Sequence, residues 1–257
     1  MRPSVAVESY RDSTARDNTS TVALLWKCEV IFHLFAYVLS LHQERSYNPY
    51  YTLVCQHLCH TSHSYKITLQ FCLWDFLRDI GETSVGGSEV IKNLKEDGVA
   101  FDVGRISSTR LRNVAKAYAW WIAKDSLTLG VLKVIYSRYH HLISPNLLQP
   151  VDFMSLQPHT RLFLREMMVQ IFLDSQVATP VLGAGPNIPT ARNGGAIEQI
   201  FIKMTRNKTL AMGLVYFMSE AFRDVSEDGE DMANLIRWAS GLAKDTLRTG
   251  VYVIPTL

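Results

Sequence analysis

The segment ERSYNPYYTLVCQHLCHTSHSYKITLQFCLWDFLRDIGE, from Glu44 to Glu82, contains the clearest structural signals of this chain. Its Asn48-Pro49 pair predicts the start of a helix, because Asn is a favoured N-cap and Pro suits the first helical position. Apolar side chains then recur at helical spacing as far as Thr61. After a short polar break, the run from Lys66 to Gly81 predicts a second helix, with Gly81 as its C-terminal cap. The segment therefore predicts a pair of adjacent helices.

The rest of the chain continues this pattern of short helices. The predicted helices are Val22 to His42, Ser107 or Ser108 to Ala123, Leu127 to His140, His159 to Asp174, Gly195 to Thr205, Thr209 to Arg223 and Asp231 to Leu247. The Gly- and Pro-rich stretches from Thr83 to Gly104 and from Val177 to Asn193 predict irregular segments. No stretch alternates with a period of two, so we predict an all-α chain, built as a stack of helical hairpins.

Composition and charge restrict the functional classes. The chain has 257 residues, 47% of them hydrophobic, and a net charge of +2, which is too small to indicate an extended nucleic-acid footprint. Residues 1 to 21 are polar, lack the layout of a secretory signal and are predicted to be disordered. The apolar run from Val22 to Leu41 resembles a membrane span, but Lys27, Glu29 and His33 interrupt it. A buried helix is therefore predicted there.

A cluster of thiols and imidazoles raises the question of a metal site. The four cysteines are Cys28, Cys55, Cys59 and Cys72, and the histidines His57, His60 and His63 lie beside the middle pair. Cys55 and Cys59 share a helix face and could begin a zinc site. No second closely spaced cysteine pair exists, so core packing in a reduced intracellular protein is the preferred interpretation and zinc the alternative.

Catalytic patterns are weak in this sequence. The cysteines and serines have no base and orienting group at a spacing that indicates a nucleophilic site. The segment from Gly183 to Gly195, GAGPNIPTARNGG, lacks the preceding strand and the Gly-Lys-Ser/Thr ending of a phosphate-binding loop. We therefore predict neither an enzyme nor a bound cofactor or metal.

An acidic edge follows the second helix of the opening pair. Asp75, Arg78, Asp79 and Glu82 fall at i, i+3, i+4 and i+7, so they line one helix face. Asp75 can pair with Arg78, which leaves Asp79 and Glu82 as negative charges predicted to face solvent. The edge is either an ordinary solvated face or a docking stripe for a basic partner, and the sequence leaves both interpretations open.

Basic residues gather in two small groups. The first is Arg105, Arg110, Arg112 and Lys116, and the second is Lys203, Arg206 and Lys208. The first group is a candidate RNA contact, although binding of this kind normally needs several phosphates neutralised together. The neighbouring Trp120-Trp121 pair is predicted to form the core and rim of a helix-packing site rather than a platform for bases.

The opening segment also resembles a known family. SYNPYYTLVCQHLC and YKITLQFCLWDFLRDIGE resemble the signature of the MA-3 domain of the nucleolar MIF-4G/MA-3 family, through the aromatic turn Tyr47 to Tyr51 and the run Leu69 to Asp75. Leu69 replaces a family Phe. LTLGVLKVI, LQPHTRLFLREMMVQIFL and FIKMTRNKTLAMGLVYFMSEAF are similar to later family helices. The resemblance covers roughly Val30 to Asp224. The family's preceding helix pair has no counterpart in residues 1 to 29, so a chain shortened at its N-terminus is expected.

The resemblance implies a fold and a function. It implies a HEAT-like stack of helical hairpins without catalytic activity, divided into a disordered segment 1–21, an MA-3-like domain 22–155 and a C-terminal helical extension 156–247. It implies a nucleolar role in small-subunit ribosome biogenesis and 18S rRNA processing, and docking to a DEAD-box RNA helicase of the initiation factor 4A type.

No family motif assigns the individual contacts, so the predicted partner-binding residues rest on the acidic edge: Asp75, Asp79 and Glu82. Two alternatives remain. One is a scaffold that binds RNA directly through Arg105, Arg110, Arg112 and Lys116. The other is a fragment of a scaffold of the translation-initiation type.

Overall fold

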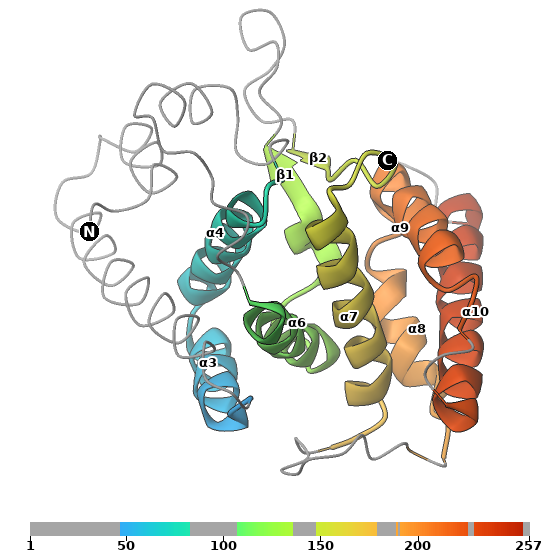
Figure 1. The fold of residues 1–257 in the computed structure, drawn as a ribbon, viewed down its shortest axis with the longest axis horizontal. Helices are drawn as coiled ribbons and strands as arrows, with labels where there is room; N and C mark the ends of the chain where they lie inside the picture. Colours follow the sequence, from blue (N-terminus) through green and yellow to red (C-terminus); the bar gives the residue numbers. More distant parts are fainter. Residues whose placement is uncertain are drawn as a thin grey trace, which may run out of the picture.

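The computed structural model describes residues 47–82, 107–135, 148–178, 189, 191–225 and 229–253. The predicted disorder at 1–21, the predicted helix at 22–42 and the irregular segment at 83–104 lie outside the described residues. Helices succeed one another across the molecule, from α3 and α4 on one side, through α6 and α7, to α8, α9 and α10 on the other (Figure 1). Within the described residues, the prediction of an all-α stack is confirmed, apart from one short pair of strands.

The seven described α-helices agree closely with the predicted ones. They are α3 (Pro49–Thr61), α4 (His63–Asp79), α6 (Ser108–Ala123), α7 (Pro158–Asp174), α8 (Gly194–Ile202), α9 (Lys208–Ala221) and α10 (Glu230–Val253). The break between α3 and α4 is the single residue Ser62, shorter than the polar stretch predicted there. None of the described helices has the length and hydropathy that a membrane-spanning segment requires.

Local capping explains where most of these helices begin. The side chain of Asn48 accepts a hydrogen bond from the Tyr50 amide at 3.0 Å, and Pro49 takes the first helical position, as predicted. Ser107 caps α6 in the same way by accepting from the Arg110 amide at 3.1 Å. Asn193 and Asn207 cap α8 and α9. Each cap satisfies an amide that has no partner within the helix.

The predicted helix from Leu127 to His140 is wrong over its described part. A 3-10 helix spans Leu129–Leu132 and is followed by strand β1 (Lys133–Ile135). This strand pairs antiparallel with β2 (Leu148–Pro150), with Lys133 opposite Pro150. Gly130 weakens a helix at this point, and the β-branched residues of β1 suit an extended strand whose partner lies far along the chain. Residues 136–140 lie outside the described residues.

Helix α6 lies at the centre of the core, and its aromatic side chains connect it to α3 and α4. The indole N–H of Trp121 donates to the Thr52 carbonyl at 2.8 Å, and the hydroxyl of Tyr118 donates to the Leu69 carbonyl at 2.7 Å. Trp120 donates to the side chain of Gln56 at 2.6 Å. Trp120 and Trp121 are both buried, so the prediction of a packing role is confirmed, although neither lies at an exposed rim.

The C-terminal helices continue the same core. Phe172 of α7 lies 6.2 Å from the ring of Phe201 in α8 and 5.9 Å from that of Phe222 after α9. Helix α10 packs along α8 and α9. Since α7 also packs against α6, the described helices share one contiguous hydrophobic cluster. The division of the chain at residues 155 and 156 stays a prediction.

Candidate partner-binding surface

The acidic edge is exposed only at one of its three acidic positions. Asp75 forms an ion pair with Arg78, and only 21% of its side chain and 9% of that of Arg78 are exposed. Burial lowers the pKa of Arg78, whereas the negative charge of Asp79 favours the charged form of its guanidinium. Asp79 has an exposed side chain, whereas Glu82 is buried at 5% exposure. The prediction that Glu82 faces solvent is therefore wrong.

The helix C-terminus explains why Glu82 turns inward. Gly81 has a φ of +96°, which glycine adopts without steric cost. Its amide donates to the Arg78 carbonyl and the Glu82 amide donates to the Leu77 carbonyl, both at 2.9 Å, which is the Schellman arrangement. Gly81 therefore acts as the predicted C-terminal cap, and it directs the next residue toward the interior.

Glu82 caps another helix. Its Oε2 atom accepts a hydrogen bond from the Gln157 amide at 3.3 Å, and Gln157 is the N-cap residue of α7. The Gln157 side chain forms no capping hydrogen bond itself. A carboxylate at a helix N-terminus satisfies a free amide and interacts favourably with the helix dipole. Glu82 thus connects the end of α4 to the start of α7, and the geometry assigns it a structural role.

The three described members of the predicted basic group lie in different surroundings. Arg110 extends over the ring of Phe76, with its guanidinium carbon 5.9 Å from the ring centroid. Lys116, one and a half turns further along α6, lies 6.0 Å from the ring centroid of Tyr47 and interacts with Asp174. Arg112 is exposed between them, and Arg105 lies outside the described residues. The three described cations therefore have separate surroundings.

The structure brings the acidic edge and the basic group together at one point. Partial loss of water around the carboxylate raises the pKa of Asp79, and the positive charge of Arg110 favours the ionised form. Arg78 acts on Asp79 in the same direction as Arg110. The sequence placed these charges in two separate candidate sites. Their meeting at the ends of α4 and α6 makes Asp79 and Arg110 the centre of the candidate surface.

The thiols lie inside the helix pair. Cys55, Cys59 and Cys72 are buried at 1–3% exposure and form no disulfides with one another, while Cys28 lies outside the described residues. Burial raises the pKa of Cys59 to about 11 and that of Cys72 to about 12, and it also raises that of Cys55. Because zinc binds the thiolate form, these environments disfavour a metal site. Within the described part of the chain, no group of three or more metal-ligating side chains occurs.

A polar cluster that the sequence did not indicate joins the far ends of α6 and α7. Lys124 donates to the carbonyls of Asp174 and Val177, and its ammonium lies 4.7 Å from the ring centroid of Trp120. A lysine in this position satisfies carbonyls that the end of α7 leaves free. Burial raises the pKa of the Asp174 carboxyl to about 6, although Gln170, Lys124 and Lys116 favour its charged form. No spacing rule connects Lys124 with Asp174, because they lie on different helices.

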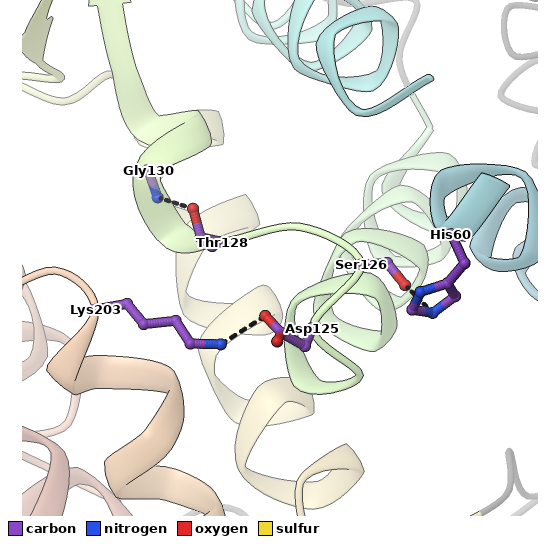
Figure 2. A network of polar contacts seen from close by, with 6 residues as sticks. All are labelled: His60, Asp125, Ser126, Thr128, Gly130 and Lys203. Carbon is purple, nitrogen blue, oxygen red and sulfur yellow. Dashed lines mark hydrogen bonds and ion pairs between the residues drawn. The ribbon is translucent and has the colours of Figure 1, made fainter. Parts of the chain in front are cut away.

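A second set of contacts surrounds the turn after α6. Figure 2 shows Asp125 facing Lys203 at the end of α8 and Ser126 facing His60 at the end of α3. The side chain of Thr128 accepts from the Gly130 amide at 3.2 Å and starts the 3-10 helix. This turn therefore contacts elements that are far apart in the sequence.

Comparisons with known proteins agree with this architecture. Residues 25–128 match the MA3 domain family. The chain is 30% identical over 141 residues to Suppressor of glycerol defect protein 1 of Schizosaccharomyces pombe, which covers 54% of this chain and 14% of that protein. It is 22% identical over 211 residues to Nucleolar MIF4G domain-containing protein 1 of Mus musculus, covering 80% of this chain and 18% of that protein. The Drosophila melanogaster homolog of the latter is 27% identical over 141 residues, or 54% of this chain and 12% of that protein. No solved structure matches.

These findings confirm the resemblance to the nucleolar MIF-4G/MA-3 proteins. The described helices form a helical stack, in which α3, α4 and α6 lie within the residues that match the helical, HEAT-like MA3 domain, and further helices follow residue 128. Domains of the MA3 and MIF4G kind are generally scaffold modules that bind proteins. The chain spans between 12% and 18% of the length of these relatives.

Proposed function

We propose that this chain, which is similar through its MA3 domain to nucleolar MIF4G proteins, is a non-catalytic binding module of a nucleolar ribosome-biogenesis factor. In this proposal it acts in small-subunit assembly and 18S rRNA processing, where it docks a DEAD-box RNA helicase of the initiation factor 4A type. The MA3 match over residues 25–128 is the observation that carries the proposal. The names of the relatives support the nucleolar location.

The proposed contact on this chain centres on Asp79. Its side chain is the exposed acidic group of the α4 edge, whereas Asp75 is paired and Glu82 is buried. Arg110 and Arg78 already neutralise part of its charge. A cationic side chain of the helicase could approach this exposed carboxylate beside the positive charges of Arg110 and Arg78. Such a charge contact favours specific recognition.

A binding experiment with the cognate helicase tests this function. Replacing Asp79 by Lys should weaken binding at least tenfold, which corresponds to about 1.4 kcal/mol, because a like charge then faces the basic partner. Glu198→Lys is the matched control, since it makes the same charge change on the exposed face of α8. Both variants should keep the helical circular-dichroism spectrum of the wild type.

The outcomes separate the function from the contact. If the wild-type chain does not bind the helicase, the helicase-docking function is wrong. If the wild type binds and Asp79→Lys binds equally well, the function stands and the contact assignment is wrong. Glu82 is unsuitable for this test, because its substitution would perturb the start of α7.

A further inference from the structure

One face of α10 points away from the helices that it packs on. The other face of this 24-residue helix is buried where α10 packs on α8 and α9, as at Ala239, Ala243 and Leu247. Because an α-helix has 3.6 residues per turn, positions i, i+4, i+7, i+11 and i+15 share one side of it. The outward side carries five exposed or half-exposed residues in that order, which we name the α10 stripe: Arg237, Gly241, Lys244, Arg248 and Tyr252.

The α10 stripe has a net positive charge. Arg237 is exposed and Lys244 is half-exposed, and within the described part of the chain neither forms an ion pair. Arg248 exposes 51% of its side chain and lies 3.7 Å from Asp245, whose side chain is 74% exposed, so this pair is weak. The other two acids of α10 are confined to its first turn. Three cations therefore follow one another along this face with a single weakly paired acid beside them.

Gly241 leaves the middle of the α10 stripe open. Glycine weakens a helix relative to alanine, so a glycine inside a helix has a cost. At Gly213 and Gly250 packing explains it, because an added Cβ would lie 2.4 Å from a side chain of another element. At Gly241 an added Cβ would meet nothing within 4 Å. The helix backbone there is accessible between Arg237 and Lys244, as it is where glycine lets a ligand approach closely.

Another cation borders the α10 stripe near Arg237. The guanidinium carbon of Arg192, in the segment before α8, lies 5.4 Å from the ring centroid of Trp238. Trp238 is half-buried and neighbours Gly241 at a spacing of i, i+3. Because Arg192 is itself exposed, it adds positive potential at the edge of the stripe.

We propose that the α10 stripe binds single-stranded nucleic acid. Arg237, Lys244 and Arg248 would each contact a phosphate. The strand would cross close to the helix backbone at Gly241, and the ring of Tyr252, which is 79% exposed, would stack on a base. Single-strand binding surfaces combine cations that follow the strand with exposed aromatic rings. An acidic protein segment would use the cations alone and would gain nothing from the ring.

The salt dependence of binding follows from the number of cations. Each phosphate neutralised on a single strand releases counterions, and the slope of log K against log salt is about −0.7 per contact. The three cations of the α10 stripe therefore predict a slope of about −2.

Fluorescence anisotropy with a short labelled oligouridine, and with an oligothymidine of equal length, tests the proposal on the full chain. The triple variant Arg237→Gln/Lys244→Gln/Arg248→Gln should lose about tenfold or more in affinity and most of the salt slope. Binding of both strands supports recognition of phosphates and bases, and a preference for oligouridine identifies the ligand as RNA. A wild-type chain that binds neither strand at low salt would overturn the proposal.

A matched control variant separates the α10 stripe from net charge. Arg161→Gln/Arg206→Gln/Lys208→Gln makes the same charge change at exposed positions of α7 and of the turn that leads into α9. It should keep the affinity and the salt slope of the wild type. Equal losses in the two triple variants would overturn the proposal, since net charge alone would then explain binding.

The variant Gly241→Leu tests whether the strand lies close to the helix backbone. Leucine favours a helix more than glycine does, so the variant should be at least as stable as the wild type. Its side chain would fill the open space between Arg237 and Lys244, so oligouridine binding should weaken about fivefold. Wild-type affinity in a folded Gly241→Leu variant would overturn the proposed path of the strand.

Tyr252 distinguishes a strand of nucleic acid from an acidic protein. Tyr252→Ala should weaken oligouridine binding about fivefold or more, whereas Tyr252→Phe should keep it, because stacking needs the ring and not the hydroxyl. Polyglutamate binding as tightly as oligouridine, with no effect of Tyr252→Ala, would overturn the proposal in favour of an acidic partner.

The proposal does not depend on helicase docking. Helix α10 lies on the opposite side of the stack from α4, whose edge carries Asp79 (Figure 1). Helicase binding should therefore be unchanged in the Arg237→Gln/Lys244→Gln/Arg248→Gln variant, and oligouridine binding should be unchanged in Asp79→Lys.

Discussion

The ammonium group of Lys203 lies 2.5 Å from the carboxylate of Asp125, although 78 residues separate them (Figure 2). Asp125 has a φ of 59°, in the left-handed region that few residues other than glycine adopt. The next residue, Ser126, is 3.4 Å from a ring nitrogen of His60. The turn after α6 therefore combines an unusual backbone conformation with contacts to both α3 and α8.

At position 125, the backbone conformation should affect the stability of variants more than the loss of the ion pair with Lys203 does. Replacing Asp125 by Val should lower the unfolding free energy by about 1 to 2 kcal/mol, because a β-branched side chain is strained in this conformation. Asp125→Asn should stay within about 0.5 kcal/mol of the wild type, since Asn tolerates the conformation and exposed ion pairs contribute little. Urea unfolding followed by circular dichroism measures both. An Asn variant as unstable as the Val variant would identify the ion pair as the main contribution.

The contact between Gly250 and Thr205 should not tolerate a methyl group. Gly250→Ala should destabilise the protein by about 1 to 3 kcal/mol, because its Cβ would lie 2.4 Å from Thr205 Cγ2. The Thr205 hydroxyl donates to the Ile202 carbonyl at 2.7 Å, which opposes rotation of the side chain away from the clash. Thermal unfolding checks this loss.

Two further variants control for helix propensity and identify the clash. Gly241→Ala, in the middle of the same helix with no atom within 4 Å of the new Cβ, should stabilise the protein by about 0.5 to 1 kcal/mol. Thr205→Ser removes the clashing methyl group. The double variant Gly250→Ala/Thr205→Ser should therefore recover much of the stability that Gly250→Ala loses. If the double variant stays as unstable as Gly250→Ala alone, the predicted steric cause is wrong.

Glu82 should matter for folding rather than for binding. Glu82→Ala should cost about 1 to 3 kcal/mol of unfolding free energy, because it leaves the Gln157 amide at the start of α7 without its acceptor. Glu82→Gln keeps an acceptor oxygen and should cost less than half as much. Chemical denaturation measures the difference. Equal stability of the wild type and the Ala variant would contradict the capping role, and weaker helicase binding by a fully folded Gln variant would return Glu82 to the contact surface.

Asp174 should make stability depend on pH in the acid range. The folded protein holds the Asp174 proton with a pKa of about 6, against 3.8 for a free side chain. Between these values the folded state binds more protons than the unfolded chain, so the unfolding free energy falls as the pH rises from about 4 to about 6. At pH 7 the buried carboxylate is therefore destabilising, by an amount on the order of 2 to 3 kcal/mol.

Substitution of Asp174 tests this dependence. Asp174→Asn keeps an acceptor for Gln170, which donates to Asp174 at 2.9 Å, and removes the buried charge. It should raise the unfolding free energy at pH 7 while leaving that at pH 4 almost unchanged. Asp245→Asn, with a 74% exposed side chain, is the control and should change neither. An Asp174→Asn variant that loses stability at pH 7 would mean that the Lys124 and Lys116 interactions outweigh burial.

The start sites of the helices could be predicted because their signals are local. Asn48, Ser107 and Pro158 each begin a helix where the sequence indicated, since a cap or a proline acts within one turn. The segment from Leu127 was predicted wrongly because its strand depends on a partner from residues 148–150. Pairing between distant segments can override the helix propensity of a short apolar stretch.

The candidate site could be predicted only in part. The spacing of Asp75, Asp79 and Glu82 correctly put charges near one helix end, but spacing does not show which side chains the next helix covers. The packing of α7 buries Glu82, and the packing of α6 brings Arg110 to Asp79. Lys124 and Asp174 carried no recognisable signal, because their contact joins two helices that meet only in the folded chain.

Periodicity, caps and signature residues are properties of neighbouring positions, so they sufficed to predict the helical stack, the helix pair at Pro49–Asp79 and the family resemblance. The packing of separate helices leaves Asp79 exposed and buries Glu82, which their spacing along one helix face does not show. Exposure and charge proximity depend on how separate helices pack, and close approaches such as that of Gly250 to Thr205 determine that packing.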